Sequence, residues 1–130
     1  MLITVALPIY TGNPYLEKAI ASVLAQEVDL ELIISDDGSS DGSLAVAENF
    51  ADSRIRLLRN DNRGIFGNLN RCVSESRGDP IQVFSQDDVM PQEYLASQAA
   101  LLAKHPDAGL VYGMPERHRR TGPPARHIRQ

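Results

Sequence analysis

The chain has 130 residues, of which 42% are hydrophobic, and this is enough apolar material for one domain with a single core. It contains no run of about 18 or more apolar residues, which argues against a membrane-spanning helix. The net charge of −4 argues against nucleic acid as a partner, because binding to a phosphate backbone depends on many lysine and arginine contacts. The single cysteine, Cys72, excludes an internal disulfide and favours a reducing compartment, so we expect a cytoplasmic protein.

The charge is uneven along the chain. From Pro115 onward there are five arginines and one acid, Glu116, so the rest of the chain is clearly acidic. We expect residues 1–114 to form one α/β domain and residues 115–130 to form a basic, flexible tail. Such a tail could touch an anionic membrane surface, which would place a cytoplasmic protein peripherally at the inner membrane.

The first part of the chain reads as strand, helix, strand. Ile3 to Ile9 is a continuous apolar run, which is typical of a strand covered on both faces. Asn13 suits a helix N-cap with Pro14 at the first helical position, and apolar residues follow at helical spacing through Leu24. A second buried strand is expected over residues 30–35.

The alternation continues to the end of the acidic part. The expected strands lie over residues 54–59, 80–85 and 109–112, the last of them short. Three helices are expected between and before these strands. Their buried residues are Leu44, Ala47 and Ala51 in the first, Phe66, Leu69 and Val73 in the second, and Leu95, Ala99 and Leu102 in the third, which Pro91 opens. The strand over residues 54–59 partly alternates, which indicates a solvated face near a sheet edge. The order predicts a three-layer α/β/α fold with a mainly parallel sheet and right-handed crossovers.

Polar clusters follow three of the expected strands: Tyr10–Asn13, Asp36–Ser39 and Gln86–Asp88. Ligands of open parallel sheets bind beyond the carboxyl ends of the strands, so the three clusters should share one rim of the sheet. Two acidic pairs on one rim would repel unless they are protonated, solvated or neutralised by a cation. Oxygen ligands suit Mg²⁺ or Mn²⁺, whose sites commonly combine one or two carboxylates with substrate phosphates.

Each cluster also has a purely structural interpretation. Asp-Gly-Ser sequences favour turns, acids such as Asp87 and Asp88 favour a helix N-terminus, and Tyr10 could pack against the first helix. Gly64 could let the backbone approach a ribose or phosphate with Arg63 as a charge partner, or it could simply supply a permissive turn. The convergence of the clusters is what favours a binding site.

As an ensemble, these stretches resemble the N-terminal half of the family 2 glycosyltransferases. The matching sequences are Val5-Ala6-Leu7-Pro8-Ile9-Tyr10, Leu16 to Gln26, Leu32 to Gly42, Asn62-Arg63-Gly64 through Asn70, and Val83-Phe84-Ser85-Gln86-Asp87-Asp88. The similarity runs from about residue 3 to residue 113, in the family's order and spacing. It implies the GT-A fold, a Rossmann-like fold of nucleotide-diphospho-sugar transferases, in truncated form.

The resemblance also implies roles for single residues. Pro8 and Tyr10 would border the nucleobase pocket, and Asp37 would accept a hydrogen bond from the imide N–H of a uracil-like base. Asp88 would contact Mn²⁺ or Mg²⁺, and Asp87 would face the ribose or the sugar. The implied small-molecule partner is a nucleotide-diphosphate sugar of the UDP type. The implied activity is glycosyl transfer in the synthesis of bacterial-type polysaccharide or glycoconjugate, to an unidentified acceptor that could be a sugar, a lipid-linked sugar or a protein.

The chain departs from the family's pattern beyond these motifs. Inverting transfer needs a general base, which in the family lies in the C-terminal half with the acceptor-binding surface, and nothing in this chain matches it. The resemblance therefore favours donor binding over turnover. A half-built sheet would leave an open edge, which favours self-association or a partner that covers it.

Two alternatives remain open at the level of sequence. One is a catalytically inert nucleotide-binding or assembly module of the same fold. The other is a receiver-type phosphoacceptor domain, which expects an acidic pair after the first strand, where this chain has Pro8-Ile9-Tyr10.

Overall fold

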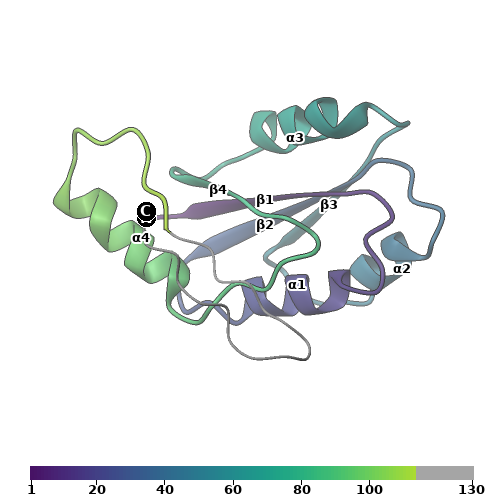
Figure 1. Ribbon diagram of the computed structural model, residues 1–130, viewed down its shortest axis with the longest axis horizontal. Helices are drawn as coiled ribbons and strands as arrows, with labels where there is room; N and C mark the ends of the chain where they lie inside the picture. Colours follow the sequence, from purple (N-terminus) through teal and green to yellow (C-terminus); the bar gives the residue numbers. More distant parts are fainter. Residues whose placement is uncertain (114–130) are drawn as a thin grey trace, which may run out of the picture.

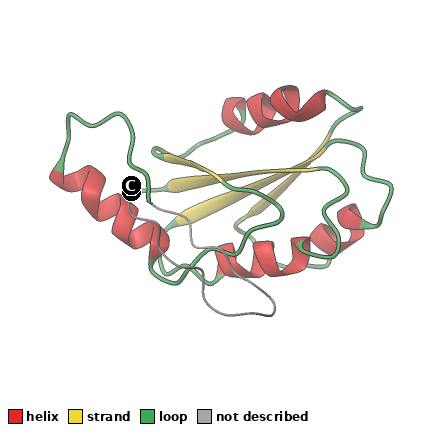
Figure 2. Cartoon of the chain, viewed as in Figure 1, coloured by secondary structure: helices red, strands yellow, loops and turns green. Residues whose placement is uncertain are grey.

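The fold is given by a computed structural model, which describes residues 1–113 (Figure 1). The predicted basic tail over residues 115–130 lies outside the described residues. Strands and helices alternate along the chain, as the sequence predicts (Figure 2). The elements are β1 (Ile3–Ile9), α1 (Leu16–Leu24), β2 (Leu30–Asp36), α2 (Ser43–Glu48), β3 (Ile55–Arg59), α3 (Gly64–Ser74), β4 (Ile81–Val83) and α4 (Tyr94–Lys104).

The strands form one parallel sheet in the order β3-β2-β1-β4. β1 is central, with Ile3 opposite Leu30 of β2 and Thr4 opposite Ile81 of β4. β1 and β2 are buried along almost their whole length because both of their faces are covered, as in other parallel sheets. β3 is an edge strand with only partly buried residues, which confirms the position predicted from its alternating sequence.

Helices cover both faces of the sheet, α3 on one side and α1 with α2 on the other (Figure 1). The larger core includes Leu7, Ile20 and Ile34 and lies on the α1 side. The smaller core joins Ala6 of β1 to Cys72 of α3. Successive residues of a strand point to opposite faces, which is why Ala6 and Leu7 belong to different cores. The predicted three-layer α/β/α fold is confirmed.

The predicted start of α1 is wrong, although its buried face is as expected. The helix buries Leu16 and Ile20 with their neighbours on the same stripe, but its N-cap is Tyr15 and has no side-chain cap. The side-chain amide of Asn13 instead donates to the backbone oxygen of Asp41 at 2.9 Å. Asn13 is therefore used to join two loops rather than to cap the helix.

α3 is rotated relative to the predicted orientation. Phe66 and Val73 were expected on its buried face, but they are 81% and 41% exposed. Asn68 and Cys72 are buried instead, with Leu69 partly buried beside them. The helix turns this face to the sheet because Asn68 hydrogen-bonds to carbonyl oxygens at the ends of β1 and β2.

Two further boundaries differ from the prediction. α2 ends at Glu48, so Ala51 lies beyond it and is exposed. The strand expected over residues 109–112 is not formed. The segment pairs with no strand of the described chain, and its Leu110 and Tyr112 are 77% and 83% exposed. β4 therefore forms the second edge of the described sheet.

Within residues 1–113, no helix combines the length and apolar character needed to cross a bilayer.

Candidate functional site

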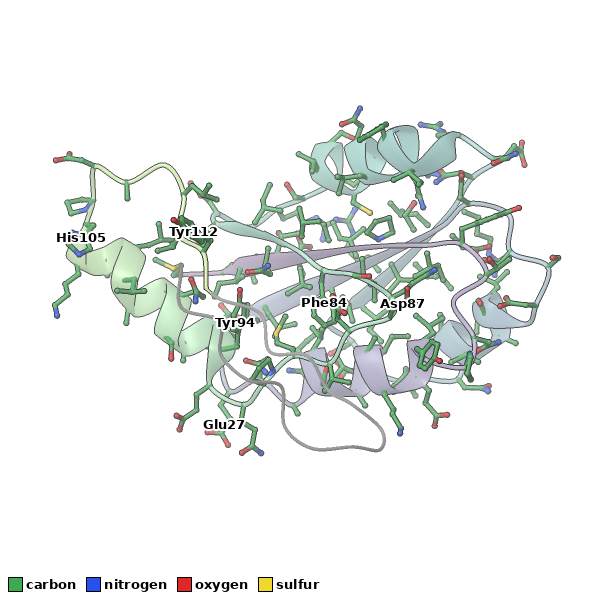
Figure 3. All side chains as sticks on the ribbon, viewed as in Figure 1. Glu27, Phe84, Asp87, Tyr94, His105 and Tyr112 are labelled. Carbon is green, nitrogen blue, oxygen red and sulfur yellow. The ribbon has the colours of Figure 1, made fainter. Side chains whose placement is uncertain are left out.

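An open cleft of about 1900 Å³ lies at the carboxyl ends of β1, β2 and β4. The residues predicted to bind ligand and metal all line it: Pro8, Tyr10, Asp37, Asp87 and Asp88. They come from the end of β1 and from the segments that follow β1, β2 and β4, which are far apart in sequence, and the parallel topology brings them to one rim. Figure 3 shows the side chains of the molecule, with Phe84 and Asp87 labelled on the segment that follows β4.

Asp37 lies at the end of β2 and is only 3% exposed. Its carboxylate oxygens accept hydrogen bonds from the backbone N–H groups of Arg63 at 2.7 Å and Gly64 at 2.9 Å. Gly64 has a φ of +79°, a conformation that favours glycine. The Arg63–Gly64 turn thus contributes backbone amides to Asp37. An ionised carboxylate has about four acceptor positions, so Asp37 can still accept from a further donor.

The loops after β1 and β2 are joined by hydrogen bonds. The Thr11 N–H donates to Ser39 Oγ at 3.0 Å, and the Gly12 N–H donates to Ser43 Oγ at 2.8 Å. The Ser43 hydroxyl in turn donates to Asp41 Oδ1 at 2.5 Å. This hydrogen bond is the main reason that the pKa of Asp41 is lowered below its ordinary value of 3.8. These contacts fix the β1 and β2 side of the rim.

Gln86 joins the segment after β4 to the end of β1. Its side-chain oxygen accepts from the Tyr10 N–H at 2.8 Å, and its side-chain nitrogen donates to the Tyr10 oxygen at 2.9 Å. The amide side chain thereby extends the pairing of β1 and β4 beyond the last residue of β4. A Cβ atom at Gly12 would lie 2.8 Å from Gln86 Oε1, so this contact leaves no room for a side chain at Gly12.

Asp87 and Asp88 are exposed on the other side of the cleft. Their backbone N–H groups donate to Ser85, at 3.4 Å for Asp87 and 3.2 Å for Asp88, but their carboxylates accept no hydrogen bond from the described chain. Among residues 1–113, no group of three or more histidine, cysteine or acidic side chains could hold a metal ion. The donor set is two oxygen-bearing side chains, which suits a hard divalent cation only if a ligand supplies further oxygens.

Pro8 and Tyr10 form the apolar part of the rim. Pro8 is half-buried near the end of β1, and Tyr10 is 51% exposed. Both line the cleft, so Tyr10 offers an accessible flat surface there rather than being buried against α1.

A buried polar network beneath the cleft is missing from the sequence-based prediction. Asn68 of α3 donates to the Ser35 oxygen at 2.9 Å and to the Ile9 oxygen at 3.4 Å. It also accepts from Asn60 at 2.8 Å, and Asn60 donates to Ser35 Oγ at 2.9 Å. The network connects α3 to the ends of both central strands.

Helical periodicity could have pointed to Asn68. The resemblance drew attention to Asn70, which is exposed in the structure. Asn68 lies four residues before Cys72, so the two share one helix face. Cys72 is a small apolar residue that is fully buried, and burial raises the pKa of its thiol to about 11. An asparagine on the same face as a core cysteine should therefore be buried as well.

The chain is similar in sequence to glycosyltransferases. The family model for glycosyl transferase family 2 matches residues 4–130. The protein EpsE of Bacillus subtilis is 36% identical over 108 residues, covering 79% of this chain and 39% of the relative. The Escherichia coli protein WfgD, named as a UDP-Glc:alpha-D-GlcNAc-diphosphoundecaprenol beta-1,3-glucosyltransferase, is 31% identical over 114 residues, covering 86% of this chain and 45% of WfgD.

Solved structures share the fold. The crystal structure of S. aureus TarS 1-349 superposes with a TM-score of 0.75 at 22% identity, covering 81% of this chain and 33% of that one. The mannosyltransferase PcManGT from Pyrobaculum calidifontis gives a TM-score of 0.71 at 25% identity, covering 78% of this chain and 32% of that one.

The chain spans less than half the length of these relatives and structures. The family model nevertheless matches nearly all of it. The match argues against a receiver-type phosphoacceptor domain. Such a domain would also need an acidic pair at the end of β1, where this chain has Pro8-Ile9-Tyr10. This chain belongs to glycosyl transferase family 2.

Proposed function

We propose that the cleft binds a nucleotide-diphosphate sugar, with UDP as the nucleotide, as the donor for a glycosyl transfer. The observation that carries the proposal is the buried carboxylate of Asp37, which faces the cleft and is fixed by two backbone amides. A fixed carboxylate with remaining acceptor positions is suited to the imide N–H of uracil, which is a donor. The cytosine ring has no N–H at the corresponding ring position.

The remaining residues of the rim suit the other parts of such a ligand. Tyr10 and Pro8 present apolar surface for the flat face of a base. An aromatic ring such as that of Tyr10 can stack on any of the bases. The cleft is open and has a volume of about 1900 Å³, so it has room for a nucleotide-diphosphate sugar.

Asp88 would hold Mn²⁺ or Mg²⁺ together with the phosphates of the ligand, and Asp87 beside it would face the ribose or the sugar. Both carboxylates are exposed and accept no hydrogen bond from the described residues, so they are free to take up these roles. When bound, the metal would neutralise the diphosphate and stabilise the charge of a departing nucleoside diphosphate. The proposal assigns no general base among residues 1–113.

Ligands named for related structures support this choice of ligand class. One structure of S. aureus TarS contains UDP-GlcNAc and another contains UDP, and the PcManGT structure contains GDP-Man and Mn²⁺. The name of WfgD specifies UDP-Glc as its donor. Because one of these ligands carries guanine, the choice of base has to be tested directly.

The test is a calorimetric titration of the chain with UDP, CDP and GDP, each with and without Mn²⁺. We expect UDP to bind more tightly than CDP, because the cytosine ring lacks the N–H that the Asp37 carboxylate would accept, and Mn²⁺ to tighten the binding of all three. Asp37→Asn should weaken UDP binding about tenfold with or without Mn²⁺, since it removes a charged acceptor, whereas Asp88→Asn should remove only the gain due to Mn²⁺.

Asp107→Asn is the matched control, because Asp107 is an exposed acid that does not line the cleft. It removes the same charge and should leave every affinity unchanged. Equal affinity of the wild type and Asp37→Asn for UDP would refute the assignment of the base pocket. A Mn²⁺ effect that survives Asp88→Asn would refute the assignment of the metal ligand.

A further inference from the structure

Asn68 joins α3 to the two central strands of the sheet. Its side chain is 3% exposed and donates to the backbone oxygens of Ser35 and Ile9 at 2.9 and 3.4 Å. These oxygens lie directly beneath the cleft, because Ile9 precedes Tyr10 and Ser35 lies two residues before Asp37. A single buried amide therefore contacts both strand ends that present the apolar and acidic parts of the rim.

The oxygen of the same amide is also used. It accepts from Asn60 Nδ2 at 2.8 Å, and that nitrogen also donates to Ser35 Oγ at 2.9 Å. The backbone N–H of Asn60 donates to the oxygen of Asp36, the last residue of β2, at 2.8 Å. Because the donors and the acceptor of Asn68 are all paired, its amide has one orientation, and a fully satisfied buried network specifies one arrangement of its elements.

One helical turn before Asn68, α3 contacts Asp37. Gly64 is the first residue of α3, and its N–H and that of Arg63 donate to the two carboxylate oxygens of Asp37. The interval of four residues between Gly64 and Asn68 is close to one turn of an α-helix. A shift of α3 at Asn68 would consequently move both amides away from the carboxylate.

We propose that Asn68 is a positioning residue for Asp37. It sets the depth and rotation of α3 on the sheet, and the start of α3 then presents the amides of its N-cap Arg63 and its first residue Gly64 to the Asp37 carboxylate. Asn68 lines the cleft, but it is almost fully buried and its side-chain nitrogen and oxygen are both used in hydrogen bonds within the protein. Its effect on a ligand therefore passes through Asp37, and this part of the proposal rests on the proposed function.

The first test measures the protein without ligand. Hydrogen exchange at the amides of Arg63 and Gly64 is compared between the wild type and Asn68→Ala. We expect the protection of both amides to fall about tenfold, the equivalent of one ordinary hydrogen bond, while the amide of Glu75 at the other end of α3 keeps its protection. Unchanged protection at Arg63 and Gly64 would overturn the proposal.

Two variants keep this test decisive. Asn68→Leu preserves the volume without burying a charge and loses the two donated hydrogen bonds, so it replaces Asn68→Ala if that variant fails to fold. Asn70→Ala is the matched control, because Asn70 is an exposed asparagine on the same helix. It should change neither the exchange rates nor the affinity for UDP.

The second test measures coupling through UDP affinity in a double-mutant cycle with Asp37→Asn. Asn68→Ala should raise the Kd for UDP about tenfold in the wild type but less than about twofold in the Asp37→Asn background, since coupled residues are not additive. An equal loss in both backgrounds would show that Asn68 acts independently of Asp37 and would overturn the proposal. If UDP does not bind the wild type at all, the proposed function fails, and hydrogen exchange still decides the role of Asn68.

Discussion

The two sides of the cleft differ in how firmly the protein holds them. On the side of β1 and β2, hydrogen bonds connect the loops to each other and to the start of α3, and Asp37 is held by two amides. On the side of β4, the strand has three residues, and the carboxylates of Asp87 and Asp88 accept no hydrogen bond from the described chain. The first side is organised before any ligand arrives, whereas the second depends on the ligand to organise it.

This difference fits the chemistry proposed for each side. Recognition of a base needs donors and acceptors at fixed positions, because a misplaced hydrogen bond loses most of its energy. A divalent cation takes part of its coordination from phosphates and water, so its protein ligands can stay free until the ligand binds. The comparison can be tested by substitutions on each side and at the contact between them.

The largest effect on stability should come from the organised side. Ser43→Ala removes the hydroxyl that accepts from the Gly12 N–H and donates to Asp41. Because Ser43 and Gly12 are buried, the N–H is left without a partner, and we expect the free energy of unfolding to fall by about 2 kcal/mol. Urea unfolding measures the change. Ser40→Ala, an exposed serine of the same loop, should change it by less than about 0.5 kcal/mol, and equal losses for the two variants would contradict the comparison.

An intermediate effect is expected where the two sides meet. The Cβ of Gly12→Ala would lie 2.8 Å from Gln86 Oε1 and 3.1 Å from Gln86 Cδ, so it should displace the side chain that pairs with Tyr10. We expect a loss of about 1 kcal/mol in urea unfolding, typical of modest overpacking. In a Gln86→Ala background there is no side-chain amide to displace, and the same substitution should cost clearly less. An undiminished cost there would show that the contact with Gln86 is not the cause.

The smallest effect is expected on the side of β4. Without ligand, Asp87→Asn and Asp88→Asn should each change the free energy of unfolding by less than about 0.5 kcal/mol, because both side chains are exposed and accept no hydrogen bond from the described residues. Thermal or urea unfolding of the two variants beside the wild type provides the measurement. A loss of about 1 kcal/mol or more for either variant would mean that this side is organised in advance as well.

Features with a local cause were predictable from the sequence. The continuous apolar runs of β1 and β2 predict strands covered on both faces, and the alternation of strands and helices predicts the parallel sheet. Once the sheet is parallel, the polar clusters after β1, β2 and β4 must share one rim, and they do. Even the edge position of β3 follows from its partly alternating residues.

Features that depend on distant partners were not predictable in this way. Phe66 looked like a core residue because it is large and apolar, but the face that α3 buries is set by hydrogen bonds from Asn68 to two strands elsewhere in the sequence. The apolar run over residues 109–112 resembles a strand, yet a strand forms only where its backbone pairs with a neighbour, and this segment pairs with no strand of the described sheet. Gln86 was grouped with the acids that follow it, although its side chain is used to pair with Tyr10.

The central position of β1 has a consequence for folding kinetics. The first strand of the chain pairs on one side through Ile3 with Leu30 and on the other through Thr4 with Ile81, so neither neighbour is local. Closing such long loops is entropically unfavourable before the contacts form, and chains rich in non-local contacts fold more slowly than helical bundles of similar size. During synthesis, β1 leaves the ribosome before β2 and β4, so it cannot be paired on both sides until the chain has been made through β4.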